Sequence, residues 1–222
     1  GGPFLSIIVE FLTSRRQRVV VDGQFGEWRR VISGVPQGSV LGPLLCILYT
    51  QDMWIGLENQ LVAYADDATL IAVIPSPDHR HLVSESLNRD LTKINNWCSL
   101  WGMKLNASKT QSMIVSRSRT LHPSHPDLFI NNVSLNTCAS FKILGVLFDN
   151  KFTFEQHIRA VSSSVAQKVG LLRKSYRIFG DSSVLKKCFN SFILPCLEYC
   201  SPAWSSAAPS HLKLLDRNVR AC

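Results

Sequence analysis

The sequence predicts an α+β protein in which short antiparallel strands and helices occupy residues 1–150 and helices alone occupy residues 151–222. Turn dipeptides separate strand-like runs in the first part, and an apolar periodicity of three to four residues dominates the second. The charge divides in the same way. Residues 1–150 hold 13 basic and 12 acidic residues (+1), and residues 151–222 hold 11 and 4 (+7), which together give +8. We therefore expect a nearly neutral first domain and a basic, helical second one.

Composition excludes several classes of protein. Hydrophobic residues make up 45% and charged residues 18%, which is an ordinary globular balance. No apolar run reaches the roughly 18–20 residues of a membrane span, so we expect no membrane partner. The seven cysteines are odd in number and lack paired short spacings, and Cys46 and Cys98 lie in apolar patterns, which predicts reduced, buried thiols in an intracellular protein. The excess of positive charge favours nucleic acid as a partner.

The first elements are a helix, a hairpin and a glycine-bearing loop. Residues 3–14 have the pattern of the end of an amphipathic helix, and Asp22-Gly23 predicts a turn between two strand-like runs. Ser39 can cap a helix that follows the loop of Gly34, Pro36 and Gly38, and Pro43 fits only its first turn. The expected buried stripe of this helix is Leu41, Leu44, Leu45 and Leu48. Such a junction suits phosphate or nucleotide contacts, although a plain loop before a core helix has the same pattern.

The run LVAYADDATLIAVI at residues 61–74 places two adjacent carboxylates, Asp66 and Asp67, between apolar strand segments that we expect to be buried. Aspartate is depleted in strands, and two neighbouring charges repel each other and are costly to desolvate. A turn accounts for one of them more easily than for both. Paired carboxylates at a tight turn suit Mg²⁺, which keeps its other positions for water and substrate phosphates. A metal site and a turn decorated with charges both remain open on these residues alone.

The next part of the chain is expected to form one more helix, followed by strands, before the chain becomes entirely helical. Apolar spacing predicts a helix from Ser76 to Gly102, followed by a loop and strand that carry Lys109. Asn131-Asn132 predicts a further hairpin. FKILGVLFD at residues 141–149 has the pattern of an apolar strand, inside which Gly145 would mark close approach by another backbone.

A long amphipathic helix is expected from a capping box at Thr153–Gln156 to Gly180. Its apolar face would be Ile158, Val161, Val165, Val169, Leu172, Tyr176 and Phe179. Basic side chains cover the remainder of its surface, namely Arg159, Lys168, Arg173, Lys174 and Arg177. Two further helices are expected to start near Asp181–Ser183 and near Ser210. The domain boundary therefore falls near residue 150.

In order, these segments resemble the reverse transcriptase of non-LTR retrotransposons, particularly jockey-like and related LINE elements. GVPQGSVLGPLL at residues 34–45 matches that family's motif B, and Tyr64-Ala65-Asp66-Asp67 matches its motif C. Residues 97–110 look like motif D. Ile143-Leu144-Gly145-Val146, with Asp149 and His157, looks like motif E and the entry to the thumb. YADD alone is a modest signal, but the four motifs in this order make coincidence very unlikely.

The resemblance implies a right-hand polymerase, with part of the fingers and a β-sheet palm in residues 1–150 and an incomplete helical thumb in residues 151–222. Asp66 would be the main motif C ligand of Mg²⁺ (or Mn²⁺), and Asp67 would be a nearby, less direct ligand. Both would serve two-metal phosphoryl transfer. The remaining roles are implied in the same way. The nucleotide and template pocket would be shaped by Gln37, Gly38, Ser39 and Tyr64. Lys109 would face the leaving pyrophosphate, and Leu144 and Gly145 would hold the primer end. The backbone of the RNA–DNA hybrid would be followed by the basic thumb residues Lys168, Arg173, Lys174 and Arg177.

One family motif has no counterpart. Motif A supplies another metal-binding aspartate, and neither Asp22 nor Asp52 occupies a suitable strand. We therefore expect the chain to be a fragment whose missing upstream region belongs to the same polyprotein, and whose isolated form is inactive. The implied partners are an RNA template, a DNA primer and dNTPs, in the nucleus, the cytoplasm or both. The alternative is a degenerate, non-catalytic remnant that binds RNA or DNA without reading sequence, and a generic basic α+β binding domain would apply only if the motif order were accidental.

Overall fold

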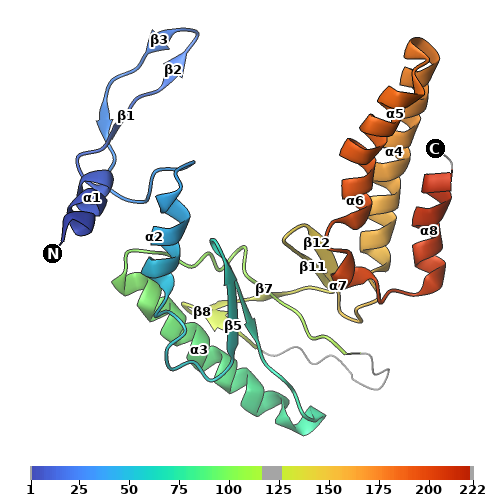
Figure 1. Ribbon diagram of the computed structural model, residues 1–222. Helices are drawn as coiled ribbons and strands as arrows, with labels where there is room; N and C mark the ends of the chain where they lie inside the picture. Colours follow the sequence, from blue (N-terminus) through green and yellow to red (C-terminus); the bar gives the residue numbers. More distant parts are fainter. Residues whose placement is uncertain (1, 117–126, 221–222) are drawn as a thin grey trace. The chain divides into compact units, whose positions relative to one another are not determined.

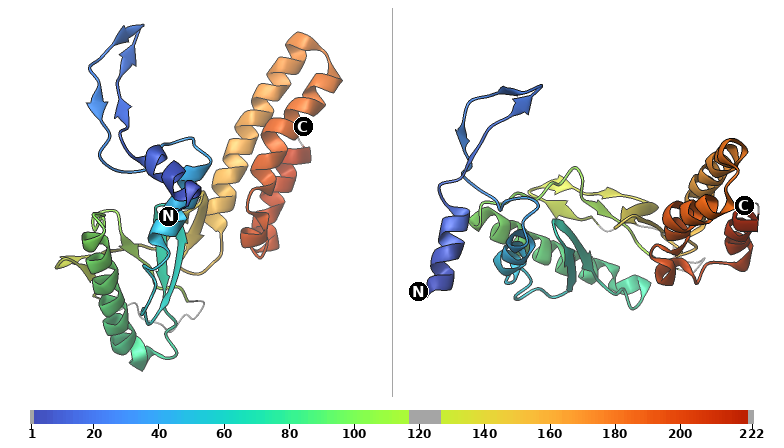
Figure 2. Two further views of the ribbon diagram at one scale, coloured as in Figure 1. Left: turned by 60° about the vertical axis from the view of Figure 1, so that its left-hand side comes forward. Right: turned by 45° about the horizontal axis from the view of Figure 1, so that its top comes forward.

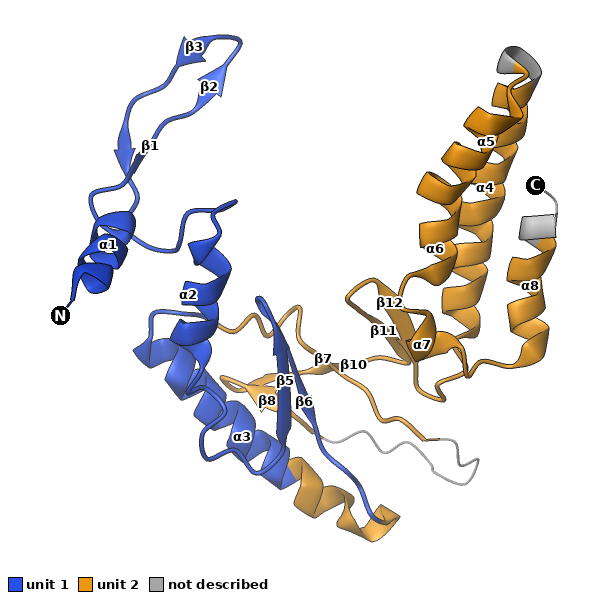
Figure 3. Ribbon diagram, in the orientation of Figure 1, with its two compact units in different colours: residues 1–75, 85–104 blue, residues 76–84, 105–222 orange. Residues whose placement is uncertain are grey.

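The computed structural model describes residues 2–116 and 127–220, and the side chains of residues 177–179 and 218–220 lie outside that description. It confirms a mixed architecture of helices and small sheets (Figure 1). The chain forms two compact units, Gly1–Pro75 with Glu85–Lys104 and Ser76–Ser84 with Leu105–Cys222 (Figure 3). No helix among the described residues combines the length and apolarity that a membrane span requires.

The first unit begins with helix α1 (Pro3–Leu12) and a long two-armed ribbon. Strand β1 (Arg16–Gln17) pairs with β4 (Arg29–Arg30), and β2 (Val20–Val21) pairs with β3 (Gln24–Phe25) (Figure 1). The predicted turn lies between β2 and β3, where Asp22 and Gly23 have φ values of 48° and 79°. Two successive positive φ values are the requirement of a type I′ hairpin turn, which Asp-Gly meets at low cost. Both the helix and this hairpin were predicted from sequence.

Helix α2 (Leu41–Thr50) packs against the C-terminal half of α3 (Arg80–Leu100) through an aromatic cluster. The ring of Tyr49 meets Trp97 and Trp101 edge-on, with centroid separations of 6.3 Å and 5.3 Å. The Trp97 indole N–H donates to Asp52 Oδ1 at 3.0 Å. Asp52 follows α2 and lies outside the strands, as the sequence predicted, and this hydrogen bond joins it to α3.

Hairpin β5 (Gln60–Tyr64) and β6 (Asp67–Ile71) carries the paired aspartates. Its strands were expected to be buried, and this expectation was wrong, since Val62, Ile71 and Val73 are 49%, 45% and 80% exposed. Among the described residues the hairpin forms a two-stranded sheet of its own. The buried stripe expected on α2 was also wrong, because Leu44 and Leu48 are half exposed. Cys46 of the same helix, expected to be a buried thiol, is exposed as well. Apolar patterning shows which face can be buried, but burial needs a neighbouring element to cover that face.

A buried carboxylate anchors the start of this hairpin. Asp90 of α3 is fully buried and accepts hydrogen bonds from the backbone N–H groups of Glu58 and Asn59, both at 2.9 Å. Asn59 Nδ2 donates to the same carboxylate at 2.9 Å. Arg89 adds a surface ion pair to Glu58 at 2.7 Å. The turn that leads into β5 is thus held to α3 by a buried charge whose oxygens are hydrogen-bonded, as burial of a charge requires.

The second unit starts with the 3₁₀ turn η1 (Pro77–His79) and the first residues of α3. Strand β7 (Gln111–Ser112) then pairs in parallel with β10 (Asn136–Thr137). The hairpin β8 (Phe129–Ile130) and β9 (Val133–Ser134) turns at Asn131 and Asn132, whose φ values of 49° and 63° confirm the predicted turn. A last hairpin, β11 (Ser140–Ile143) and β12 (Val146–Asp149), leads into the helices.

Helices complete this unit (Figure 2). They are α4 (Glu155–Phe179), α5 (Ser182–Cys188), the π-helical turn η2 (Phe189–Ile193), α6 (Leu194–Glu198), α7 (Ser201–Trp204) and α8 (Pro209–Arg220). The starts of α5 and α8 agree with the sequence prediction. The side chain of Asp181 accepts from Ser183 N at 2.7 Å and so caps α5.

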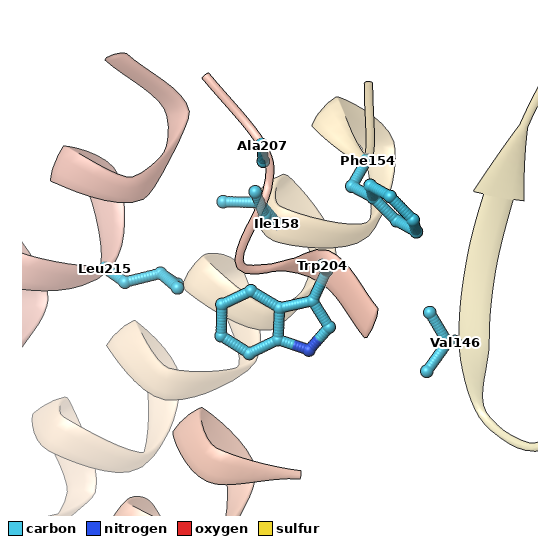
Figure 4. Close-up of a cluster of buried hydrophobic side chains, with 6 residues drawn as sticks. All are labelled: Val146, Phe154, Ile158, Trp204, Ala207 and Leu215. Carbon is cyan, nitrogen blue, oxygen red and sulfur yellow. The ribbon is translucent and has the colours of Figure 1, made fainter. Parts of the chain in front are cut away.

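The core of the second unit joins the last hairpin to the helices. Ile158 of α4 is fully buried between Val146 of β12, Trp204 of α7 and Leu215 of α8 (Figure 4). Val165, Val169 and Ile193 form a second buried cluster between α4 and η2. The predicted apolar face of α4 is therefore confirmed, except that Tyr176 is 49% exposed and the side chain of Phe179 lies outside the described residues. The proposed boundary near residue 150 stays a prediction about domains, and in the structure β12 and α4 share this core.

Candidate active site

The two aspartates lie at the closed end of the β5–β6 hairpin. Tyr64 and Asp67 are cross-strand partners, so Ala65 and Asp66 form a two-residue turn between them. All four side chains are exposed, and Tyr64 is 65% exposed. Successive residues of a strand point to opposite faces, but the turn residue Asp66 is released from that alternation. The sequence Tyr64–Asp67 thus offers two neighbouring carboxylates at one exposed tip.

Ala65 has an unusual backbone conformation for its residue type. Its φ is 53°, in the left-handed region that costs a residue with a Cβ about 1–2 kcal/mol. Five cross-strand residue pairs, the first Gln60 with Ile71 and the last Tyr64 with Asp67, hold the turn in this conformation. Backbone strain of this kind is more frequent at functional sites than elsewhere in proteins.

The donor set at this tip fits a divalent metal only in part. Carboxylate oxygens are the ligands that Mg²⁺ takes from proteins, usually one or two together with water and substrate phosphates. Asp66 and Asp67 can supply that contribution. Within residues 2–116 and 127–220, no group of three or more His, Cys, Asp or Glu side chains is arranged to hold a metal ion. The tip therefore presents two neighbouring carboxylates, and no third His, Cys, Asp or Glu side chain of the described residues joins them.

The loop before α2 is organised by Ser39 and Gly42. Ser39 Oγ donates to the carbonyl oxygen of Pro36 at 2.7 Å and accepts from Gly42 N at 3.0 Å. A Cβ on Gly42 would lie 2.8 Å from Ser39 Oγ and 3.0 Å from the Pro36 oxygen, so only glycine allows this bridge. Ser39 therefore caps α2 as predicted, and Gln37 and Gly38 are left exposed on the outside of the loop. No hydrogen bond within the described residues joins this loop to the Tyr64–Asp67 turn.

Lys109 lies in the second unit, on a turn built by Asn106. Asn106 Oδ1 accepts from Ser108 Oγ at 2.7 Å and from Lys109 N at 3.2 Å. The Lys109 side chain is exposed, one residue before Thr110 and two before β7. The local hydrogen bonds fix its backbone and leave its ammonium group available to a ligand.

Gly145 proves to be a turn residue, which corrects its placement inside a continuous strand. Ile143 pairs with Val146, and Leu144 and Gly145 form the turn with φ values of 45° and 87°. Tyr199 Oη donates to the Leu144 carbonyl oxygen at 2.7 Å. A Cβ on Gly145 would lie 3.2 Å from Tyr199 Cε1. The close approach expected at Gly145 exists, but a tyrosine side chain makes it in place of another backbone.

Asp149 and His157 connect this hairpin to α4. The Asp149 carboxylate accepts from Thr153 N at 3.0 Å and Phe154 N at 2.6 Å, so it holds the turn that precedes α4. The predicted capping box does not form, because the N-cap residue of α4 is Phe154 and Thr153 Oγ1 accepts only from Glu155 N, at 3.4 Å. Burial acts to raise the pKa of Asp149, but these backbone hydrogen bonds hold it below its ordinary value. His157 is 6% exposed, and burial, with the charge of Lys142 nearby, lowers the pKa of its imidazole.

The basic residues of α4 differ in what their side chains touch. Arg173 and Lys174 are exposed. Lys168 is half-buried, and its ammonium donates to the Phe192 carbonyl oxygen at 3.2 Å and to Cys196 Sγ at 2.7 Å. Its proposed contact with a nucleic-acid backbone stays a prediction, and that contact would compete with these internal hydrogen bonds. The side chain of Arg177 lies outside the described residues.

The structure brings together Tyr64, Asp66 and Asp67 in one turn, and Leu144 and Gly145 in another. Sequence reasoning missed two supporting residues: Asp90, which holds the turn that leads into β5, and Tyr199, which holds the turn of Leu144 and Gly145. An aspartate at an apolar position of a helical pattern was a readable signal for Asp90. The contact of Tyr199 with a residue 55 positions earlier had no local signal.

Residues 3–148 match the family model described as reverse transcriptase (RNA-dependent DNA polymerase). The chain is 31% identical over 223 residues to the RNA-directed DNA polymerase from mobile element jockey of Drosophila melanogaster, covering 95% of this chain and 24% of that protein. It is 27% identical over 225 residues to the probable RNA-directed DNA polymerase from transposon X-element of the same fly, covering 97% and 24%. A probable RNA-directed DNA polymerase from transposon BS is 31% identical over 236 residues, covering 99% and 25%. The chain thus spans about a quarter of the length of these curated relatives, and no solved structure matches it.

Proposed function

The chain belongs to the reverse transcriptase family, among the RNA-directed DNA polymerases of non-LTR retrotransposons, and from this we propose that it is the later part of a polymerase core. In this proposal the complete polypeptide adds dNTPs to a primer 3′-hydroxyl on an RNA template. Residues 1–150 contribute part of the fingers and palm, and residues 151–222 contribute part of a thumb. The observation that carries the proposal is the tip at Ala65–Asp67, where a tight turn presents two exposed carboxylates.

Asp66, as the residue within the turn, would be the main ligand of Mg²⁺ or Mn²⁺, and Asp67, the first residue of β6, would be the less direct one. The metal ions would supply activation of the primer hydroxyl and charge stabilisation on the pyrophosphate. Lys109 would hold a proton or a positive charge against the leaving pyrophosphate oxygen. Gln37, Gly38, Ser39 and Tyr64 would shape the nucleotide and template pocket. Exposure of Gln37 and Gly38 beside a capped helix start supports this role.

The remaining residues would hold the nucleic acid. The turn of Leu144 and Gly145 would contact the primer end, and its support by Tyr199 gives it a fixed shape. The phosphate backbone of the hybrid would meet the basic residues Lys168, Arg173, Lys174 and Arg177, without sequence recognition. Because no third possible ligand among the described residues joins Asp66 and Asp67, the proposal assigns the rest of the metal site to an upstream region of the same polyprotein.

Primer extension tests this proposal. The full polypeptide that contains this segment is assayed for dNTP incorporation on an RNA template with Mg²⁺, beside residues 1–222 alone. We expect extension by the full polypeptide and none by residues 1–222. Robust extension by residues 1–222 would show that the metal site is complete within the chain. Absence of extension by the full polypeptide, with intact binding of a primer–template duplex, would favour the non-catalytic remnant.

A further inference from the structure

The ribbon of residues 15–31 carries an unusual arrangement of like charges. It contains five arginines and two acids, Asp22 and Glu27. Arg16 of β1 lies directly opposite Arg30 of β4, and Gln17 lies opposite Arg29. Like charges at directly opposed positions destabilise a strand pair. Among the described residues no carboxylate forms an ion pair with Arg16, Arg29 or Arg30.

Arg15 is the arginine of this segment whose side chain hydrogen-bonds to the backbone. Its Nε donates to the Leu12 carbonyl oxygen at 3.0 Å, and its guanidinium also donates to the carbonyl oxygens of Ser33 and Gly34. These bonds tie the two ends of the ribbon together just before the loop that carries Gln37. Arg16, Arg18, Arg29 and Arg30 are all exposed and remain available to a ligand.

Two aromatic rings lie beside these arginines. The Arg18 guanidinium carbon is 3.9 Å from the centre of the Phe25 ring and 4.6 Å from that of the Trp28 ring. The rings nevertheless stay 62% and 57% exposed. The second arm has three residues between its paired segments (Gly26 to Trp28) where the first has two (Arg18 and Val19). An extra residue of this kind re-aims the side chains next to it, so Trp28 reaches the guanidinium of Arg18.

We propose that this ribbon binds single-stranded nucleic acid. Arginine forks bind phosphate oxygens, and exposed aromatic rings stack on unpaired bases, which is the combination used for single strands. An incoming phosphate would also relieve the repulsion between Arg16 and Arg30. A duplex offers phosphates but keeps its bases stacked, and an anionic membrane offers no flat rings, so neither uses both features. The proposal rests on the proposed function only in expecting a nucleic-acid partner, and it adds a site outside the motifs of the family resemblance.

The test measures binding of a fluorescent oligouridine to residues 1–222 at several salt concentrations. The variant Arg16→Gln/Arg30→Gln removes the opposed pair, and since it also removes a repulsion it is expected to fold. Loss of two phosphate contacts lowers the slope of log K against log salt by about 1.4, because a single strand contributes about 0.7 for each contact. The control variant Lys104→Gln/Lys151→Gln removes the same charge from exposed positions elsewhere and is expected to leave the slope unchanged.

Tryptophan fluorescence, as a second measurement, locates the contact between oligouridine and the ribbon. Stacking of a base on Trp28 quenches its fluorescence, so oligouridine is expected to quench part of the tryptophan emission of the parent chain. That part is expected to disappear in Trp28→Phe, which keeps an aromatic ring and most of the affinity. Equal salt slopes for the ribbon and control variants, or quenching unchanged in Trp28→Phe, would overturn the proposal. Binding to vesicles of anionic lipid that depends on Arg16 and Arg30, with oligouridine binding unaffected by them, would replace it by a membrane contact. Primer extension by the full polypeptide is a separate measurement, so the two proposals can fail independently.

Discussion

Tyr199 Oη donates a 2.7 Å hydrogen bond to the carbonyl oxygen of Leu144, and the same tyrosine ring would lie only 3.2 Å from a Cβ on Gly145. A residue between α6 and α7 thereby fixes the turn of the β11–β12 hairpin. Gly145 is required twice, by its φ of 87° and by this close approach. The turn assigned to the primer end is therefore shaped by the helical part of its own unit.

We predict that Gly145→Ala lowers the free energy of unfolding by about 2 kcal/mol, from left-handed strain and displacement of Tyr199. Tyr199→Phe removes one hydrogen bond and should cost about 1 kcal/mol. Gly170→Ala is the matched control, since it lies inside α4 with nothing within 4 Å of its added methyl group, and it should gain about 0.5–1 kcal/mol. Urea unfolding measures all three. A neutral Gly145→Ala would show that the turn does not need its glycine.

Asp90 gives the second prediction. Asp90→Asn places an amide group against the N–H donors of Glu58 and Asn59 and should cost about 3 kcal/mol, because a hydrogen-bonded buried charge is lost. Faster amide hydrogen exchange is expected at Asn59, just before β5. The control Asp78→Asn changes an exposed carboxylate in η1 and should stay within about 0.5 kcal/mol. Unchanged exchange at Asn59 would contradict an anchoring role for Asp90.

His157 gives a pH dependence. Its folded-state pKa lies below the ordinary value of about 6.5, so the folded protein resists protonation that the unfolded chain accepts. The contribution of neutral His157 to stability is fully present above the ordinary pKa of about 6.5. It is lost as the pH falls from there towards the lower folded-state pKa. His157→Asn keeps an acceptor for Leu147 N, which bonds to Nδ1 at 3.4 Å, and removes the titration. The free energy of unfolding should therefore decrease less steeply in this variant as the pH is lowered from about 7 to about 5, a range that spans the ordinary pKa of histidine. Equal slopes would show that His157 does not titrate differently on unfolding.

Sequence predicted the features of this fold that depend on neighbouring residues. Asp22-Gly23 and Asn131-Asn132 carry their turn geometry in their own chemistry, and α3 and α4 follow from apolar spacing. Burial was predicted less well, since Leu44 and Val62 have apolar patterns but no described element covers them. The turn at Leu144 was missed because leucine does not favour a positive φ, and a distant tyrosine stabilises it there.

The candidate site divides in the same way. The aspartate pair was evident because two adjacent charges interrupt apolar strands, and the structure adds that Ala65 is strained and that Asp66 occupies the turn itself. The role of Ser39 at the start of α2 was readable as a local polar signal. The capping box expected at Thr153–Gln156 was wrong, because the chain enters α4 through a left-handed Phe154 and the preceding turn is held by Asp149. The supporting contacts of Asp90 and Tyr199 depend on the tertiary fold, so no local pattern could predict their partners.

The central claim is that the carboxylates of the β5–β6 tip serve DNA synthesis, and extension rates of the full polypeptide carrying Asp66→Asn, Asp67→Asn or the control Asp78→Asn test it most directly. Mg²⁺-dependent extension on an RNA template should fall about a thousandfold for Asp66→Asn and by a smaller factor for Asp67→Asn, since the loss of a main metal ligand removes charge stabilisation from the transition state. The control should retain the parent rate, and all three variants should bind a primer–template duplex with unchanged affinity. An Asp66→Asn polypeptide that extends the primer at the parent rate would contradict the claim.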